Sequence, residues 1–393
     1  MSALWAATAI SLVGNQVTTL ALPWLVLTTL GTPIDAGIVG AAIVLPAVFG
    51  AFAGGVIIDR IGPRRTSVVA DVLSGLAVAA IPIAASTVGL GIPLLVGLAF
   101  VGALLDAPGQ TARQVILPDL AAPAGVGLER ANAVFQTVEN ASLLIGPAIA
   151  GLIIVAIGPL GALWLDAATF LVSAVVIRVL VPDVRPADGD EAADLGAGLR
   201  ALAADPVLRV LMVIAAIGNL VFTPLFIVVL PALAARSGES AASLGAMLAV
   251  LGAGMIGGSL GLGLLGDRVN RRAALVLGFV GTGAGLIVAS LGLPLPVLLV
   301  ALGGAGLASG LINPIAFTVM QERVPAATRG RVFGAVLGGV LVAAPVGMVV
   351  LGAITDAAGP RTALLISGAA IVAVGGLVAI LRASHDLGQP VPA

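Results

Sequence analysis

Four acidic residues lie inside apolar stretches of this chain, where a carboxylate has few partners and is costly to hold. They are Asp71, Asp106, Glu139 and Asp166. Counted along a helix, Asp106 lies about 10 Å from Arg113 and Glu139 about 13 Å from Arg130, so both carboxyls reach a similar depth. If they face each other, the two do not both ionise readily, and one would hold a proton. Asp106, Glu139 or the pair could therefore carry an exchangeable proton; each could equally be a hydrogen-bonded residue in helix packing.

Asp71 and Asp166 have simpler interpretations. Asp71 follows Arg65 by six residues, about 9 Å of helix, and we interpret it as an interfacial partner of the neighbouring arginines. Asp166 lies near the outer end of its apolar segment, and we interpret it as a structural hydrogen-bonding residue. Neither is assigned to proton exchange.

Other polar residues follow the same segments at helical spacing, so each segment presents one polar face. One face carries Asp106, Gln110, Arg113 and Gln114, and the next carries Asn132, Gln136, Glu139 and Asn140. We expect these faces to line a shared aqueous cavity. The candidate cavity residues are Asn15, Thr18, Thr19, Gln110, Gln136, Asn140, Asn219, Thr223 and Asn313.

The composition requires a membrane around these segments. Of 393 residues, 60% are hydrophobic and 9% charged, and the mean hydropathy of +1.19 is outside the range of soluble globular proteins. The chain has no cysteine, which excludes disulfides and thiol chemistry. No nucleophile and base pair, metal cluster or phosphate loop is visible, so we expect no enzyme activity, cofactor or metal ion. The net charge of -1 indicates no nucleic-acid partner.

Hydropathy predicts twelve spans, each long enough to cross a bilayer as a helix. Six lie near residues 4–30, 36–58, 67–88, 92–114, 131–156 and 161–181. Six more lie near residues 207–234, 242–266, 273–291, 295–320, 331–356 and 361–381. The sequence therefore predicts an all-α membrane protein with twelve transmembrane helices.

The two sets of six spans are copies of each other. Seven short matches recur in the same order at offsets of 198 to 208 residues, among them the motif ending at Asn15 and again at Asn219. We predict two six-helix bundles, residues 1–181 and 207–382, joined by a cytoplasmic linker, 182–206, and followed by a tail, 383–393. Substrate sites of such duplicated bundles lie at the interface of the repeats.

The arginines predict the orientation. With the N-terminus inside, the cytoplasmic loops and tail collect every arginine except Arg236 and Arg361, sixteen of eighteen. We therefore expect a multi-pass protein of the cell membrane with both termini in the cytoplasm, acting as a monomer.

The loop between spans 2 and 3 concentrates charge around a tight turn made by Gly62 and Pro63. The charged motif comprises Gly55, Asp59, Arg60, Gly62, Arg64 and Arg65, and a second copy comprises Gly263, Asp267, Arg268, Asn270, Arg271 and Arg272. This pattern resembles the loop signature of the major facilitator superfamily. The resemblance covers essentially the whole chain and implies that the motif is a conformational latch for alternating access, with Asp59 and Arg65 governing turnover.

Span 5 contains Gly146, Pro147 and Gly151, which are similar to the antiporter signature of drug-exporting members of that superfamily. Residues 106–120 and 129–151 resemble the branch with macrolide and siderophore exporters. The resemblance implies export. The physical alternative is that these residues only allow close helix packing and a local bend.

A sparse lining of amides, hydroxyls and one or two acids within apolar walls suits amphipathic, neutral or cationic molecules of drug size. We therefore predict a secondary transporter that exports such molecules in exchange for protons. An importer of the same architecture and a non-transporting membrane receptor or scaffold are the alternatives. The partners expected are the small-molecule substrate, protons and the lipid bilayer.

Overall fold

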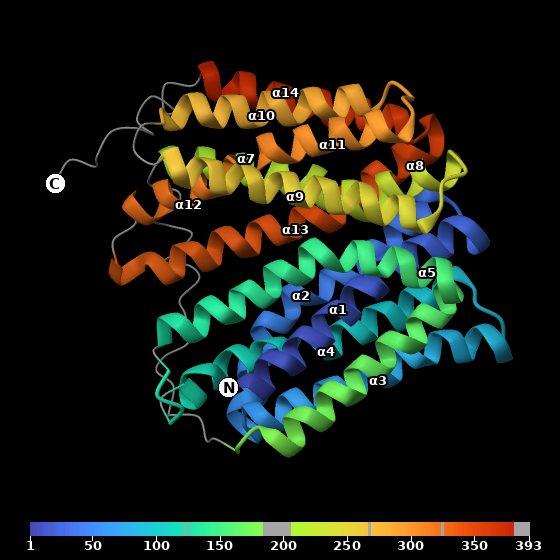
Figure 1. The fold of residues 1–393 in the computed structure, drawn as a ribbon, viewed down its shortest axis with the longest axis vertical. Coiled ribbons are helices and arrows are strands. Elements are labelled where there is room, and N and C mark those ends of the chain that lie inside the picture. Colours follow the sequence, from blue (N-terminus) through green and yellow to red (C-terminus); the bar gives the residue numbers. More distant parts are fainter. Residues whose placement is uncertain (122, 127, 184–205, 266–268, 324–325, 381–393) are drawn as a thin grey trace. The chain divides into compact units, whose positions relative to one another are not determined.

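The computed structural model describes residues 1–121, 123–126, 128–183, 206–265, 269–323 and 326–380, and all regular structure in these ranges is helical (Figure 1). The helices of the first half are α1 (Ser2–Leu25), η1 (Val26–Leu30), α2 (Pro33–Ile61), α3 (Pro63–Thr87), α4 (Ile92–Ala121) and α5 (Leu128–Leu180). Those of the second half are α7 (Pro206–Pro224), η2 (Leu225–Val229), α8 (Leu230–Arg236), α9 (Ala241–Leu265), α10 (Arg271–Ala289), α11 (Leu295–Ser309), α12 (Ile312–Arg323), α13 (Ala326–Ala358) and α14 (Pro360–Ile380).

Every predicted span falls on one or more of these helices. Within the described residues, nine helical stretches are long and apolar enough to cross a membrane, and the segments Pro33–Pro46 and Val342–Ala358 are shorter apolar helices. One of the nine, Val134–Leu180, covers two predicted spans. The helices form two compact units, one of Met1–Asp190 with Ala234–Gly245 and the other of Glu191–Leu233 with Ala246–Ala393.

Glycine followed by proline separates consecutive helices at three places. Gly158 has a φ of 74° and breaks α5 into two rods, and Gly359 has a φ of 89° immediately before Pro360 begins α14. Gly62, with a φ of 84°, ends α2, and Pro63 begins α3, as the sequence predicts for this turn. Glycine adopts positive φ without a steric penalty, and proline is well suited to the first helical position, so each pair makes a sharp reversal.

A wide, π-helical turn follows a proline at the end of the first helix of each half. Pro23 lies in the last turn of α1, before η1, and Pro224 is the last residue of α7, before η2. Proline removes a backbone donor from the helix ladder, and the wider turn accommodates that loss. The first helix of each half is therefore irregular toward its C-terminal end.

Close helix contacts in the first unit depend on small residues. Helix α1 packs on α5, α3 packs on α4 and α5, and α2 packs on α4. A Cβ added at Gly14 would lie 2.2 Å from Asp166 Oδ1, so only glycine lets α1 approach α5 at this level. In the second unit α7 packs on α13, and α10 packs on α11 and α14, which is the same pattern of neighbours.

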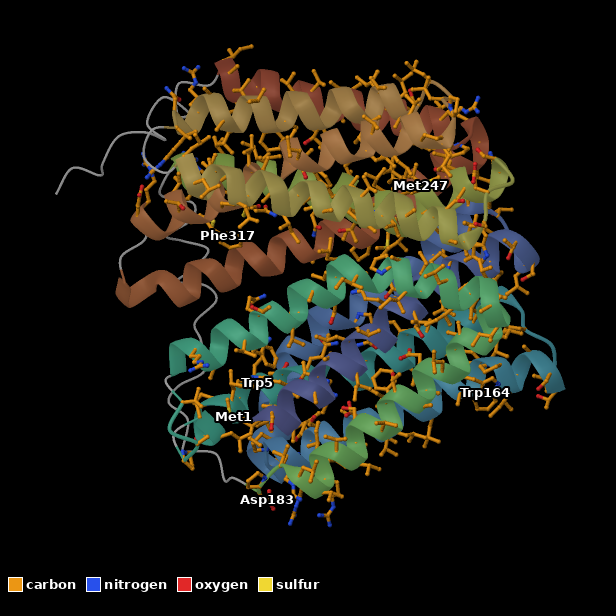
Figure 2. The ribbon with its side chains drawn as sticks, in the orientation of Figure 1. Met1, Trp5, Trp164, Asp183, Met247 and Phe317 are labelled. Carbon is orange, nitrogen blue, oxygen red and sulfur yellow. The ribbon has the colours of Figure 1, made fainter. Side chains whose placement is uncertain are left out.

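Large apolar side chains cover outward faces of the helices. Leu152 is 62% exposed, Val300 75% and Ile380 79%. Trp164, which is 49% exposed, projects from α5 (Figure 2). A soluble protein would not expose so much apolar surface, whereas these side chains suit contact with lipid acyl chains.

A buried ion pair joins α3 and α4 in the interior of the first unit. Arg113 Nη2 donates to Asp71 Oδ1, and the side chains are 1% and 0% exposed. Arg113 also donates to Ser67 Oγ and to Ser173 Oγ of α5, both at 3.2 Å. The interpretation of Asp71 as a partner of the arginines around Arg65 is therefore wrong, because Asp71 turns inward toward α4.

The second unit places apolar residues at the corresponding positions. Ser67 and Asp71 correspond to Leu275 and Phe279, 208 residues further on, which is the offset between the two loop motifs. Arg113 corresponds to Met320 at the offset of 207 shared by Gln114 and Gln321, and Ser173 corresponds to Val374 at the offset of 201 shared by the Gly-Pro pairs. Leu275, Phe279, Met320 and Val374 belong to one buried cluster. The chain therefore fills the same interior position with an ion pair in one unit and with apolar packing in the other.

The Arg113–Asp71 pair leads to a prediction on stability. Replacement of one partner, in Arg113→Met or Asp71→Leu, leaves a buried charge without its counter-charge and should cost about 3–5 kcal/mol. The double variant removes both charges, as the second unit does, and should recover most of that loss. The measurement is the thermal unfolding midpoint of the purified protein in detergent. A double variant no more stable than either single variant would contradict this account.

Candidate functional site

A cavity of about 330 Å³, hereafter the first cavity, lies within the first unit. Its polar lining consists of Asn15, Thr18, Thr19, Asp106, Gln110, Thr111, Gln114 and Asp166. Apolar side chains, including Ile81 of α3 and Phe170 of α5, complete the wall. The cavity combines a few polar groups with an apolar wall, which is the usual composition of a small-molecule site.

Asp106 of α4 is the central acid of the first cavity. Its Oδ2 atom accepts hydrogen bonds from Asn15 Nδ2 at 3.0 Å and from Gln110 Nε2 at 2.5 Å. Its Oδ1 atom is buried and has no hydrogen-bond partner among the described residues. A buried polar atom without a partner is costly, so this oxygen is suited to hold a proton or to accept a hydrogen bond from a ligand.

Asp166 of α5 is a second acid in the same cavity. It is fully buried; its Oδ2 accepts from Thr18 Oγ1, and its Oδ1 accepts from Thr169 Oγ1 at 3.1 Å. The predicted hydrogen-bonding role is confirmed, but its place in the cavity lining was not predicted. The sequence signal for this place in the lining is an acid inside an apolar span, together with two threonines, Thr18 and Thr19, on the polar face of span 1.

The structure divides the predicted polar face of α4. Gln110 and Gln114 line the first cavity with Asp106, whereas Arg113 turns to Asp71 and Ser67 of α3. The polar residues of α4 therefore face two places, the first cavity and the buried contact with α3. No arginine is in the lining described for the first cavity. Asn15, Thr18 and Thr19 of α1 are all in that lining.

The candidates on α5 lie elsewhere. Glu139 is half-buried and Gln136 is exposed, and neither is in the described lining of the first cavity. The side chain of Asn140 lies outside the described residues. The described hydrogen bonds of the Asp106 carboxyl come from Asn15 and Gln110, and a pairing of Asp106 with Glu139 stays a prediction.

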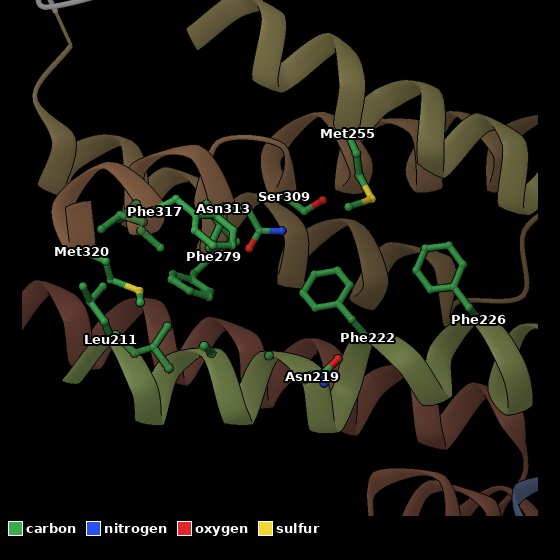
Figure 3. A pocket seen from close by; sticks show the side chains of 16 residues that line it. Leu211, Asn219, Phe222, Phe226, Met255, Phe279, Ser309, Asn313, Phe317 and Met320 are labelled. Atoms are coloured by element: carbon green, nitrogen blue, oxygen red, sulfur yellow. The ribbon is translucent and has the colours of Figure 1, made fainter. Parts of the chain in front are cut away.

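A cavity of about 320 Å³, hereafter the second cavity, lies within the second unit (Figure 3). Asn219 of α7 and Asn313 of α12 are among its lining residues, and the lining described contains no charged side chain. Thr223 is not in that lining; its Oγ1 donates to Asn219 Oδ1 at 2.7 Å and so orients the amide.

The residues of the predicted latch hold helix ends within each unit. Arg64 donates to the carbonyl oxygen of Arg178 at the end of α5, and Arg272 donates to the carbonyl oxygen of Ala379 at the end of α14. Positively charged side chains at helix C-terminal ends are favourable because the last carbonyls are otherwise unpaired. Arg60 and Arg65 are exposed. The surroundings of Gly55, the side chain of Asp59, and all of Asp267 and Arg268 lie outside the described residues.

The predicted antiporter motif is a site of close packing. A Cβ at Gly146 would lie 2.5 Å from Gln16 Cγ, and one at Gly151 would lie 2.4 Å from the carbonyl oxygen of Ala241 in the same unit. Pro147 is buried inside α5. These contacts explain why small residues are needed here, and a role in the direction of transport stays a prediction.

Comparison with known proteins identifies the family of this chain. The family model described as Major Facilitator Superfamily matches residues 4–270 and again residues 212–393. The chain is 34% identical over 384 residues to the multidrug efflux pump Tap of Mycolicibacterium fortuitum, covering 95% of this chain and 93% of that protein. The protein of the same name from Mycobacterium tuberculosis (strain ATCC 25618 / H37Rv) is 34% identical over 383 residues, covering 95% and 91%.

Solved structures share the fold at low sequence identity. The nucleoside transporter NupG has a TM-score of 0.78 at 15% identity, covering 96% of this chain and 97% of its own. A bacterial homologue of the iron transporter ferroportin, solved in an inward-facing state, has a TM-score of 0.75 at 15% identity, covering 99% and 98%. Two units of apolar helices, each enclosing a cavity with polar residues, are the arrangement of a membrane transport protein built from repeats. The chain belongs to the Major Facilitator Superfamily and is a transporter, not an enzyme.

The second copy of the charged motif leads to a prediction on pH. Arg271 Nη1 and Nη2 donate to Glu322 Oε2 and Oε1 at 2.6 and 2.9 Å, and this hydrogen bonding lowers the pKa of the Glu322 carboxyl below its ordinary value of 4.5. The stability from this pair is therefore present above pH 4.5 and is lost as the pH falls through the lowered pKa.

Glu322→Gln should lower the free energy of unfolding at pH 7 by no more than about 1 kcal/mol, because the pair is exposed, and should lower the unfolding midpoint accordingly. The difference from the unsubstituted protein should shrink below pH 4.5. Thermal unfolding in detergent across pH 3 to 7 measures both effects, with Glu239→Gln as the matched control. A difference that persists at pH 3 would refute the assignment.

Proposed function

We propose that this transporter exports amphipathic molecules of drug size, of the drug, macrolide or siderophore class, in exchange for protons by alternating access. One observation carries the proton coupling: Asp106 is a buried carboxyl in a polar cavity, and one of its oxygens has no described partner. Relatives over 95% of the chain are named multidrug efflux pumps, which supports the substrate class and the direction.

Exchange follows from competition at one carboxyl. Asn15 and Gln110 hold Asp106 through Oδ2, so the carboxyl keeps a fixed position in the lining of the first cavity. A proton on Oδ1 neutralises the carboxyl, whereas a deprotonated carboxylate attracts a cationic or hydrogen-bond-donating substrate. Because Asp106 cannot be protonated and paired with a cation at once, binding of one partner releases the other. Glu139 is proposed to take part in the same exchange from α5.

The first cavity suits neutral or cationic substrates better than anions. Its described lining contains two acids and no arginine, because Arg113 is paired with Asp71 behind the cavity wall. An anion in this space would meet Asp106 and Asp166 with no arginine in the described lining, which is unfavourable in a poorly solvated interior. Hydroxyls and amides from α1 and α4 provide hydrogen bonds without a fixed charge.

The proposed setting is the cell membrane, with both termini cytoplasmic and the protein acting as a monomer. The distribution of arginines supports this orientation. The motif at Asp59 and Arg65 and its copy at Asp267 are proposed to act as conformational latches. Gly146, Pro147 and Gly151 are proposed to support export, since they bring α5 into close contact with its neighbours.

The proton-coupling proposal predicts the behaviour of two neutralised variants. Asp106→Asn and Glu139→Gln each keep the size of the side chain but cannot release a proton. In proteoliposomes, each should abolish uptake of ethidium driven by a pH gradient while leaving ethidium binding in place. Loss of the acid removes the exchange step without emptying the cavity of hydrogen-bonding groups.

The matched control is Asp119→Asn, which neutralises another acid on α4 outside the lining of the first cavity. It should transport ethidium at the rate of the unsubstituted protein. Undiminished pH-driven uptake in both Asp106→Asn and Glu139→Gln would remove these residues from the coupling mechanism. Uptake that follows the proton rather than opposing it would indicate an importer.

A further inference from the structure

The second cavity gathers an unusual share of the chain's aromatic side chains. Only 3% of the residues are aromatic, yet four of the ten phenylalanines and two of the six methionines line this one space. They are Phe222, Phe226, Phe279, Phe317, Met255 and Met320. Figure 3 shows Phe222, Met255 and Asn313 reaching the cavity from α7, α9 and α12. Such a concentration in a chain poor in aromatics indicates a specific surface.

Two amide positions relate this cavity to the first one. Asn219 corresponds to Asn15 at an offset of 204 residues, and Asn313 corresponds to Asp106 at the offset of 207 that also relates Gln114 to Gln321. Each cavity therefore presents an asparagine from its first helix, opposed in the first cavity by a carboxyl and in the second by a neutral amide. The second cavity therefore has a polar side chain at the position of Asp106 but no charge there.

Three further positions, two polar and one aliphatic in the first cavity, are phenylalanine in the second. Thr18 and Leu22 of the first cavity correspond to Phe222 and Phe226 at the offset of 204, and Gln110 corresponds to Phe317 at the offset of 207. In the first cavity, Thr18 and Gln110 donate to the two acids. In the second cavity phenylalanine rings occupy both positions, and the counterpart of Asp106 is the neutral Asn313.

The chemistry of the second cavity favours an uncharged ligand. A cation over phenylalanine faces gains about 0.5–2 kcal/mol. Taking an ion from water into a poorly solvated cavity without a counter-charge costs several kcal/mol, so the desolvation cost outweighs that gain. Flat apolar rings bury much area against phenylalanine and methionine side chains, and the amides of Asn219 and Asn313 can satisfy a hydroxyl or carbonyl group.

We propose that the second cavity is a binding site for uncharged aromatic molecules, with Phe222 and Phe317 as the stacking surface and Asn313 as the selector against charge. The volume of about 320 Å³ accommodates a fused two-ring system. That the bound molecule is also transported rests on the proposed export function. The binding itself does not, because it requires neither a proton nor a gradient.

The test is isothermal titration calorimetry of the full-length protein in detergent with two matched probes. One is 2-naphthalenemethanol, which is uncharged, and the other is 2-naphthylmethylammonium, which carries the same rings and a positive charge. In the second cavity the alcohol should bind at least about tenfold more tightly than the ammonium probe, a difference of one decade in Kd. Equal or tighter binding of the ammonium probe that Phe317→Leu weakens, and that therefore lies in the second cavity and not at the acids of the first, would overturn the proposal.

Variants locate the binding. Phe317→Leu should weaken binding of the alcohol several-fold, and the double variant with Phe222→Leu should weaken it about tenfold or more. The matched control is Phe100→Leu on α4, outside the lining described for either cavity. Loss of affinity in Phe100→Leu equal to that in Phe317→Leu would assign the binding elsewhere. Phe317 is 42% exposed, so its single variant stays informative if the double variant does not fold.

Asn313→Asp provides a gain-of-function test, because it restores in the second cavity the acid that Asp106 supplies in the first. It should weaken binding of the alcohol and strengthen binding of the ammonium probe, so that the charged probe is preferred. Unchanged preference would contradict the role of Asn313. If pH-driven ethidium transport fails while these binding results hold, the export proposal falls and the binding site stands.

Discussion

A carboxylate or guanidinium inside a lipid-embedded bundle must find its partners within the protein, and this constraint organises the first unit. Asp71 is held by Arg113, Asp106 by Asn15 and Gln110, and Asp166 by threonine hydroxyls. Each of these contacts joins different helices or successive turns of one helix, so the polar groups also determine which helix faces meet. Asp106 is the acid of this network that lines the first cavity and has one carboxyl oxygen without a described partner.

The second unit meets the same packing requirement without charge. At the positions of the buried ion pair it has Phe279 and Met320, and at the position of Asp106 it has Asn313. Replacing a buried pair by well-packed apolar residues is often neutral or stabilising, so the ion pair of the first unit is not needed for the fold as such. Two units with the same fold can therefore differ at these interior positions, with charged side chains in one and apolar side chains in the other.

Hydropathy and local turn chemistry were sufficient to predict the helical spans and the reversal at Gly62, because both depend on short stretches of chain. The partner of Asp71 could not be predicted. Arg65 is close in sequence and Arg113 is 42 residues away, and only the packing of α3 on α4 decides between them. For the same reason Arg113 was assigned to the cavity face: it shares the spacing of Gln110, but its long side chain reaches α3. An acid inside an apolar span predicts a hydrogen-bonded Asp166, while its place in the cavity lining depends on how α5 packs on α1.

The π-helical turns at Val26–Leu30 and Leu225–Val229 change the direction in which later side chains point around the helix axis. A π-helical turn contains about one residue more than an α-helical turn, which rotates everything beyond it by roughly 100° about the axis. A face that is counted from Asn15 through Thr19 therefore cannot be extended past Leu25 by adding three or four, nor one from Asn219 past Pro224. The C-terminal end of each first helix presents a phase of its own, so substitutions there will follow a different periodicity from those around the cavities.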